Sequence, residues 1–143
     1  ILSSLAQKPI RQDIAVTGSV NQNGRIQAIG GVNEKIEGFY HVCKRDGLTG
    51  NQGVMIPSAN VPNLLLRSEI VKAVDDGTFH IYAVDTIEEG VEILTGISAG
   101  TQQEDGSYPE NTLFNLVEKK LDVFAETFRK YYSPIMSQET SPE

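Results

Sequence analysis

A lysine near the start of a predicted helix is the side chain whose position most suggests chemistry. Lys35 follows the pair Gly30-Gly31 in a stretch where apolar residues recur at helical spacing. A helix start carries about half a positive charge, which disfavours a second cation, and we expect partial burial beside Ile36 and Phe39 to act in the same direction. Both effects favour the neutral amine, the form in which a lysine acts as a general base.

These residues also admit plainer interpretations. Lys35 could be a solvated surface lysine, and Glu34 could be the acidic residue that a helix start favours. Gly30 and Gly31 fit a tight turn, a close backbone approach or an anion site at a helix start. No complete phosphate-loop pattern surrounds them, which argues against nucleotide binding by this segment.

The histidines and the cysteine indicate structural roles. His41 and His80 fall on a predicted helix and a predicted strand, far apart in the chain, and lone histidines are more often structural than ligating. Two histidines and one cysteine also make a poor set of metal ligands. Cys43 lies on the apolar face of its helix, so we expect an inert buried thiol and no internal disulfide.

Length, composition and charge narrow the class of protein. The chain has 143 residues, 39% of them apolar, and a net charge of −7, and only residues 1–50 are mildly basic. We therefore expect a globular domain with its own core and no nucleic-acid partner, because phosphate binding needs a basic face. No apolar run approaches the roughly 20 residues that span a bilayer and no signal peptide is recognisable, so we expect no membrane segment and a cytoplasmic location.

Strands and helices are predicted to alternate along residues 1–96, after a short helical stretch at residues 1–6. The predicted strands are at 13–20, 25–29, 53–57 and 79–84, the predicted helices are at 32–46, 68–74 and 86–94, and a helical turn is expected at 60–66. Asn23-Gly24 predicts the turn of a hairpin, and Thr86 with Glu89 resembles a capping box. The pattern predicts an α/β (α+β) fold packed by helices, with a sheet that the hairpin makes mixed and not purely parallel.

The rest of the chain has a different character. Residues 97–111 are poor in large apolar groups and are predicted to form a linker, and residues 112–132 are predicted to form a long helix. Its apolar residues step by three and four from Phe114 to Tyr131, the seam of a helix that packs lengthwise on another element. We expect that seam to dock on its own domain in preference to a neighbouring subunit. Residues 133–143 are polar and predicted to fray.

The order of the segments resembles the proteolytic domain of the Lon family of ATP-dependent proteases over about residues 1–96. The resemblance is carried by Pro-Ile-Arg-Gln-Asp-Ile-Ala-Val-Thr-Gly at 9–18, Asn-Gly-Arg-Ile-Gln-Ala-Ile-Gly-Gly-Val-Asn-Glu-Lys at 23–35, and Val-Met-Ile-Pro at 54–57. The Thr-Gly and Gly-Gly-x-x-Glu-Lys elements, in this order, are more specific together than either is alone. The resemblance implies the fold of a Lon proteolytic domain.

It also implies a serine peptidase with a Ser-Lys dyad, in which Lys35 takes the proton from the serine. Gly30 and Gly31 would support the turn before the lysine, and the hydroxyl of Thr17 would accept a hydrogen bond from its amine. Thr17 is equally an ordinary β-branched strand residue.

The resemblance places the nucleophile in a Gly-x-Ser-Ala-[Gly/Ser] element at the start of the helix that residues 1–6 would continue, and no Gly-x-Ser-Ala precedes Thr17 in this chain. We therefore expect the serine to lie upstream of Ile1 and these residues alone to be an inactive fragment. Ser3 and Ser4 are interpreted as packing or surface residues. Ser19 stands where many members of the family carry an acid, which indicates a branch whose dyad differs from the best-known type.

The resemblance further implies protein substrates, a hexameric ring, and ATP and Mg²⁺ bound by an ATPase module outside these residues. No cofactor or metal is expected in residues 1–143 themselves. A function of a different class stays open, because fold alone does not establish chemistry. The chain could be a non-catalytic Lon-like domain that serves an ATPase in assembly or substrate contact.

Overall fold

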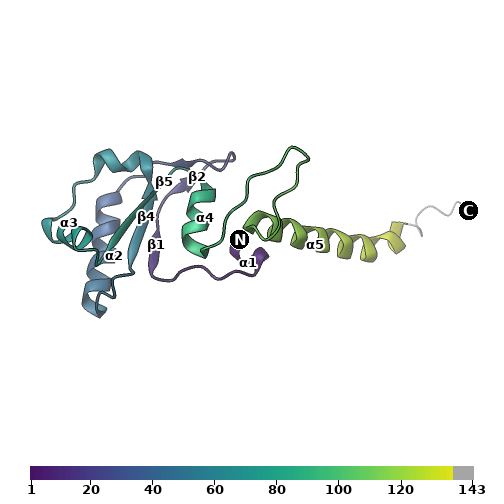
Figure 1. Ribbon diagram of the computed structural model, residues 1–143. Coiled ribbons are helices and arrows are strands. Elements are labelled where there is room, and N and C mark those ends of the chain that lie inside the picture. Colours follow the sequence, from purple (N-terminus) through teal and green to yellow (C-terminus); the bar gives the residue numbers. More distant parts are fainter. Residues whose placement is uncertain (137–143) are drawn as a thin grey trace, which may run out of the picture. The chain divides into compact units, whose positions relative to one another are not determined.

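The computed structural model of the chain describes residues 1–136. It divides into two compact units, one formed by Ile10–Gly96 and the other by Ile1–Pro9 together with the chain from Ile97 onward. The elements, labelled in Figure 1, are α1 (Leu2–Ala6), β1 (Ile14–Val16), β2 (Ser19–Val20), β3 (Ile26–Gln27), α2 (Val32–Asp46), β4 (Gly53–Pro57), the 3-10 helix η1 (Ser58–Asn63), α3 (Ser68–Asp75), β5 (His80–Val84), α4 (Ile87–Thr95) and α5 (Leu113–Met136).

The first unit is built on a parallel sheet in the order β1-β4-β5. The register places Gly53 of β4 opposite Ile14 on one side and His80 on the other. All five residues of β4 are buried. A continuous apolar run is typical of a parallel strand that is covered on both faces, which explains the sequence Val54-Met55-Ile56.

Helices cover both faces of this sheet (Figure 1). Val54 and Ile56 pack in a cluster with residues of α2 and α3, including Ile36 and Ile70. Met55 points to the opposite face, because side chains alternate along a strand, and packs in a second cluster with residues of α4. The observed fold therefore confirms the predicted α/β class, with α2 and α3 on one face and α4 on the other.

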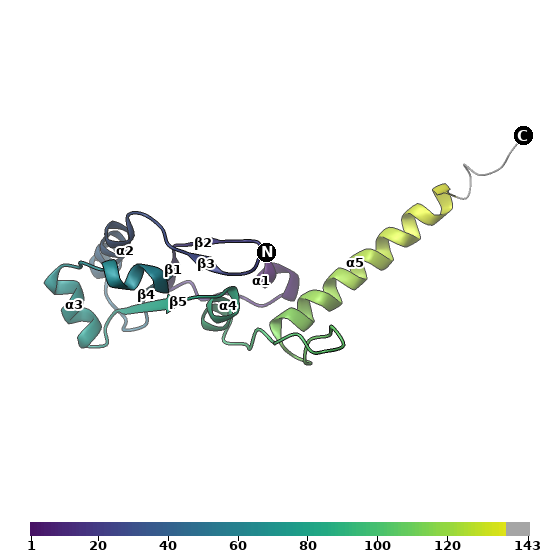
Figure 2. The same cartoon turned by 90° about the horizontal axis from the view of Figure 1, so that it is seen from above.

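The predicted hairpin is present as a separate antiparallel pair, β2-β3, whose strands run side by side in Figure 2. Gly24 in its turn has a φ of +73°, a value that favours glycine. The Ile26 amide donates to the Asp85 carbonyl at 2.9 Å, and the Ile87 amide donates to the Gly24 carbonyl at 2.9 Å. The hairpin is thus fastened to the end of β5 and to the start of α4.

Local predictions differ from the structure mainly at element ends. The strand expected over 13–20 is two strands, because the Thr17 amide still donates to the Met55 carbonyl at 3.0 Å but the chain then leaves the sheet at Gly18 to enter the hairpin. The helical turn expected at 60–66 is η1 and begins earlier, directly after Pro57. The predicted cap of α4 is confirmed, since the Thr86 side chain accepts from the Glu89 amide at 3.3 Å.

The second unit contains α1 and α5, which pack on each other. Leu113 and Val117 in the first turns of α5 are buried, and the ring of Phe114 meets that of Tyr108 edge-on at 5.3 Å. Among the described residues from 97 to 112 there is no helix or strand. The helix α5 continues to Met136, and residues 137–143 of the predicted tail lie outside the described residues. Within residues 1–136, no helix is long and apolar enough to cross a membrane.

A surface carboxylate joins α2 to α3. Glu69 of α3 accepts a hydrogen bond from the Lys44 ammonium at 2.6 Å and lies 3.1 Å from Nε2 of His41, both on α2. The hydrogen bond from Lys44, followed by that from His41, lowers the pKa of Glu69 from 4.5 to about 2. Because the pKa is lower in the folded chain, the carboxylate stabilises the fold above about pH 4.5, and that stabilisation is lost as the pH falls towards 2.

Replacing this carboxylate should change the acid sensitivity of the fold. In denaturant unfolding between pH 6 and pH 2, Glu69→Gln should be less stable than the parent at pH 6, with the difference vanishing near pH 2. Glu104→Gln removes an exposed carboxylate that has no ion pair among the described residues, and it should show no such trend. A difference for Glu69→Gln that is independent of pH would contradict this account.

Candidate active site

The candidate residues belong to segments that meet where the parallel strands end. Thr17 directly follows β1, η1 follows β4, and Asp85 follows β5. The helix α2 starts at the same edge of the sheet, because it must return to the amino end of β4 to make the next strand parallel. The carboxyl edge of a parallel sheet is where α/β proteins commonly bind ligands.

The start of α2 depends on a left-handed glycine. Gly31 precedes the helix with φ +68° and ψ +27°, and its carbonyl accepts a hydrogen bond from the Lys35 amide at 3.1 Å. Gly30 has no positive φ, and a Cβ built on it would meet no atom within 4 Å. Of the two glycines, only Gly31 is therefore required by the backbone conformation.

Lys35 is exposed, and its ammonium makes no hydrogen bond or ion pair with the side chains described in residues 1–132. The prediction that Lys35 is partly buried beside Ile36 and Phe39 is therefore wrong in the part of the chain that the structure describes. Ile36 occupies the fully buried position of this turn, and a rotation of about 100° per residue carries the neighbouring Lys35 to the solvent. The structure thus places a free cation at the start of α2.

Thr17 is half-buried beside a small apolar cavity of about 120 Å³. The walls also include Gly18 from the same segment, Met55 from β4, and Val91 from α4. This volume is below the roughly 300 Å³ at which ligand pockets begin, so it can admit a single apolar side chain and not a whole small molecule. Among the described residues, no hydrogen bond joins the Thr17 hydroxyl to Lys35.

A buried asparagine fixes the segment that leads into the glycine turn. The side chain of Asn60 in η1 is within a residue that is only 4% exposed, and it forms two hydrogen bonds with the backbone of Ile29. The Ile29 amide donates to Oδ1 of Asn60 at 3.0 Å, and Nδ2 of Asn60 donates to the Ile29 carbonyl at 2.9 Å. The loop after β4 is therefore tied to the residue just before Gly30.

A second asparagine, Asn33, connects the start of α2 to the end of η1. Asn33, on the first turn of α2, donates from Nδ2 to the Asn63 carbonyl at 3.3 Å and accepts from the Leu65 amide at 2.9 Å. Sequence reasoning missed both Asn33 and Asn60, because they join segments about 30 residues apart and no local spacing marks such pairs. The local signals near Asn60 were Pro57, at the end of a buried strand, and the helical turn predicted at 60–66.

Ser3 and Ser19 are held by structural contacts. The Ser3 hydroxyl donates to the Lys8 carbonyl at 2.7 Å, beyond the end of α1, and Ser4 is exposed on the same helix. The Ser19 hydroxyl donates to Oε1 of its cross-strand neighbour Gln27 at 3.2 Å. These contacts agree with the interpretation of Ser3 and Ser4 as packing or surface residues.

The histidines and the cysteine are also held by structural contacts. Nε2 of His80 lies 2.8 Å from the Gly50 carbonyl, and Nε2 of His41 lies 3.1 Å from the Glu69 carboxylate. Cys43 is buried, and this burial raises the pKa of its thiol. Within the described residues, no group of three or more His, Cys, Asp or Glu side chains is arranged to hold a metal ion.

Comparison with known proteins identifies the class to which this fold and edge belong. A sequence model described as the Lon protease (S16) C-terminal proteolytic domain matches residues 1–96, so the chain belongs to this family. The match contains the sheet, both helical layers, and the turn that carries Lys35.

Individual relatives are similar over different lengths. A Lon protease homolog of Escherichia coli (strain K12) is 53% identical over 97 residues, which are 68% of this chain and 17% of the relative. A Lon protease homolog of Haemophilus influenzae is 39% identical over 132 residues, 92% of this chain and 22% of the relative. An archaeal Lon protease of Thermococcus kodakarensis is 34% identical over 93 residues, 65% and 13% of the two chains. The chain thus spans about a fifth of the length of the first two relatives.

The two glycines before Lys35 should respond differently to the same substitution. Gly31→Ala places a Cβ on a left-handed residue and should lower the free energy of unfolding by about 1–2 kcal/mol. Gly30→Ala meets open space without a positive φ and should change it by less than about 0.5 kcal/mol. Thermal or denaturant unfolding of the two variants checks this, and equal losses would show that the φ of Gly31 is not the controlling factor.

Removing the Asn60 side chain should destabilise the chain at the same turn. Asn60→Ala leaves the half-buried amide and carbonyl of Ile29 without this partner, so the free energy of unfolding should fall by about 1–2 kcal/mol. Hydrogen exchange at Ile29 should accelerate accordingly. Asn63→Ala is the matched control, since its exposed side chain lies on the same 3-10 helix without a hydrogen bond among the described residues. A neutral Asn60→Ala would contradict the assigned role.

Proposed function

We propose that residues 1–143 carry the lysine of a Ser-Lys proteolytic centre in an ATP-dependent serine endopeptidase of the Lon type. Lys35 is the general base in this proposal, and the serine lies outside these residues. Membership of the proteolytic-domain family supports the reaction class. The observation that carries the assignment is an exposed cation at the carboxyl edge of the sheet, in the first helical turn after a left-handed glycine that the backbone requires.

The proposed reaction is acyl transfer in two steps. The serine hydroxyl gives its proton to Nζ of Lys35 while its oxygen attacks the carbonyl carbon of the scissile peptide bond. Lys35 then gives this proton to the leaving amine, and water hydrolyses the acyl-enzyme with Lys35 again acting as base. Thr17 would accept a hydrogen bond from the lysine amine and orient it towards the serine. Gly31 and Asn60 position the turn from which Lys35 projects.

The exposure of Lys35 sets a requirement on the missing part of the centre. A lysine acts as a base through its neutral amine, which burial favours. Because Lys35 is exposed in these residues, the segment that brings the serine must also cover the lysine. The 143-residue chain alone should therefore be inactive in peptide hydrolysis, because it lacks the nucleophile and because Lys35 is exposed to solvent.

The remaining properties proposed for the intact enzyme lie beyond this chain. Its substrates are proteins, its assembly is a hexameric ring, and its location is cytoplasmic. In this proposal ATP and Mg²⁺ are bound by an ATPase module outside residues 1–143, which contain no complete phosphate-loop pattern. The cavity of about 120 Å³ beside Thr17 supports a peptide substrate with an apolar side chain.

A second candidate is a non-catalytic module of an ATPase that serves assembly or substrate contact. Two observations favour it. Lys35 has no side-chain partner among the described residues, and no Gly-x-Ser-Ala element precedes Thr17. The run Gly96–Ala99 has these residue types, but it follows α4 and begins no helix. The two candidates differ in one property, which is whether proton transfer by Lys35 is needed for activity.

Substitution of Lys35 tests the proposal in a gene product that also supplies the serine of the proposed centre. Lys35→Gln should lower casein hydrolysis by about 10²- to 10⁴-fold, the usual contribution of a general base. Lys35→Arg keeps a positive charge but cannot give up its proton, so it should be equally inactive. Lys44→Gln is the matched control on the same helix, and it should leave hydrolysis unchanged.

The outcomes separate the two candidates. Activity retained in Lys35→Gln would remove Lys35 from the centre. Activity retained only in Lys35→Arg would assign an electrostatic role to the lysine in place of proton transfer. An intact gene product that shows no hydrolysis, and no serine labelling by an organophosphate, would favour the non-catalytic module.

A further inference from the structure

The second half of α5 presents large apolar side chains to the solvent. Every described residue from Leu121 to Tyr132 is exposed, including Phe124 at 50%, Phe128 at 60% and Tyr131 at 73%. A run of exposed aromatic side chains on one helix is costly in water and marks a surface that binds another protein.

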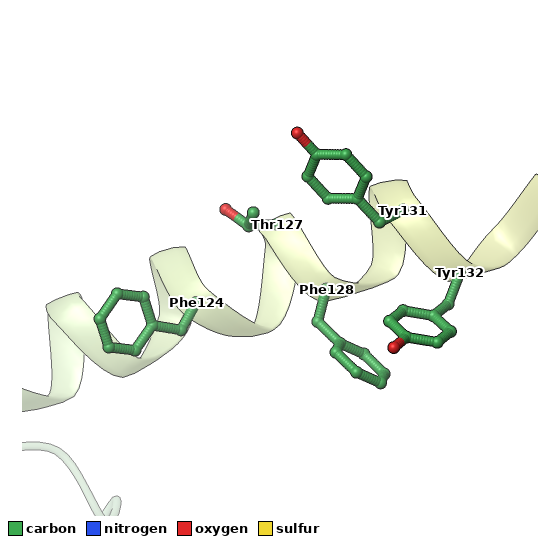
Figure 3. A pocket seen from close by; sticks show the side chains of 5 residues that line it. All are labelled: Phe124, Thr127, Phe128, Tyr131 and Tyr132. Atoms are coloured by element: carbon green, nitrogen blue, oxygen red, sulfur yellow. The ribbon is translucent and has the colours of Figure 1, made fainter.

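These side chains form one shaped surface. Phe124, Thr127, Phe128, Tyr131 and Tyr132 line a shallow hollow of about 560 Å³ along the helix. Figure 3 shows Phe128 and Tyr132 projecting together on one side of the hollow, and Thr127 with Tyr131 on the other. The rings of Phe128 and Tyr132 are stacked with centroids 4.2 Å apart. We refer to these five residues with Leu121 as the α5 face.

The α5 face continues a seam that is already used inside its own unit. Val117 is buried in the packing of the first turns, and the steps from it to Leu121, Phe124, Phe128 and Tyr131 are four, three, four and three residues. This is the spacing at which two helices pack lengthwise. The helix α1 has five residues against 24 in α5, or about 8 Å against about 36 Å, so it is too short to cover the whole seam.

We propose that the α5 face binds the same face of a second copy of the chain, with the two helices antiparallel. An antiparallel pair centred near residue 126 sets Leu121 of one copy opposite Tyr131 of the other, and Phe124 opposite Phe128. Each apolar residue of the seam then meets another member of the same set. Oppositely directed helix dipoles further favour this arrangement over a parallel one.

The distribution of charge fits an identical partner. The seam positions from Leu121 to Tyr131 are uncharged, and the residues that flank its centre are Ala125 and Thr127, which are small and neutral. The charged side chains between Leu121 and Tyr132 occupy the outer positions of the helix, namely Asp122, Glu126, Arg129 and Lys130. No like charges are therefore brought face to face, which is the usual obstacle to pairing a charged helix with itself.

The area available is sufficient for a specific interface. An aromatic side chain buries about 150–250 Å² when fully covered, and the four aromatic residues of the α5 face are 50–73% exposed. Covering them with Leu121 on both copies removes roughly 1,000 Å² of surface, the size at which specific interfaces begin. This pairing is independent of the proposed proteolytic function, because it uses none of the residues at the carboxyl edge of the sheet.

The oligomeric state of the 143-residue chain tests the proposal. Light scattering after size exclusion should show a dimer at roughly 100 μM, above the micromolar range of weak specific interfaces. Phe128→Asp places a carboxylate in each half of the interface and should raise the dimer dissociation constant about tenfold or more. Lys130→Asp introduces the same residue at an outer position and should retain the dimer. Circular dichroism shows whether both variants keep their helices.

Cross-linking tests the direction of the helices. In a Cys43→Ser background, Ala125→Cys should be joined between copies by a short bismaleimide, because residue 125 lies next to the two-fold axis. Leu121→Cys should not be joined, since its two copies are about 15 Å apart along the helices. A monomer at all concentrations, a dimer that survives Phe128→Asp, or cross-linking of Leu121→Cys in preference to Ala125→Cys would each overturn the proposal. A monomer would indicate that the α5 face is covered by another part of its own chain or by a different partner.

Discussion

Burial of β4 on both faces is the constraint on which the Ile10–Gly96 unit depends. Its five residues are buried, so apolar cover is needed on each side of the sheet, and α2 with α3 supplies one side while α4 supplies the other. The close approach of β5 also limits the residue type at the start of β4, because a Cβ on Gly53 would lie 2.7 Å from the His80 carbonyl oxygen. The first residue of β4 is a glycine for that reason.

The parallel direction of the strands then determines where chemistry can take place. Each strand must be followed by a connection that returns across a face, so the ends of β1 and β4 and the start of α2 share one edge. The Asn60 side chain converts this proximity into a fixed geometry by holding both backbone groups of Ile29. Lys35 is positioned by this edge of the sheet, because its ammonium makes no hydrogen bond or ion pair with the side chains described in residues 1–132.

The elements with strong local patterns were predictable from the sequence. The helical spacing of residues 32–46, the apolar run 53–57 and the Asn23-Gly24 turn each gave the observed element. Local patterns do not report hydrogen bonds between distant segments, and so the break at Gly18 and the role of Asn60 were missed. The exposure of Lys35 was missed for a related reason. The spacing of apolar residues shows which face of α2 is buried, but it does not show how far other elements cover the residues at the edge of that face. On α5, the spacing of apolar residues predicted the seam. It did not predict that Val117 would be buried while the seam residues from Leu121 onward are exposed.

The fastening of the hairpin to α4 has a consequence for cooperativity. A two-stranded hairpin is at best marginally stable by itself, and here its turn and second strand are held through the Gly24 carbonyl and the Ile26 amide. Unfolding of the first turn of α4 therefore breaks the hydrogen bond from the Ile87 amide to the Gly24 carbonyl. The hairpin that loses this bond is the segment that connects β1 to the glycine turn before α2. Displacement of α4 would therefore change the position of the segment that leads to Lys35 without any contact to Lys35 itself. The conformation of α4 is in this way coupled to this edge of the sheet.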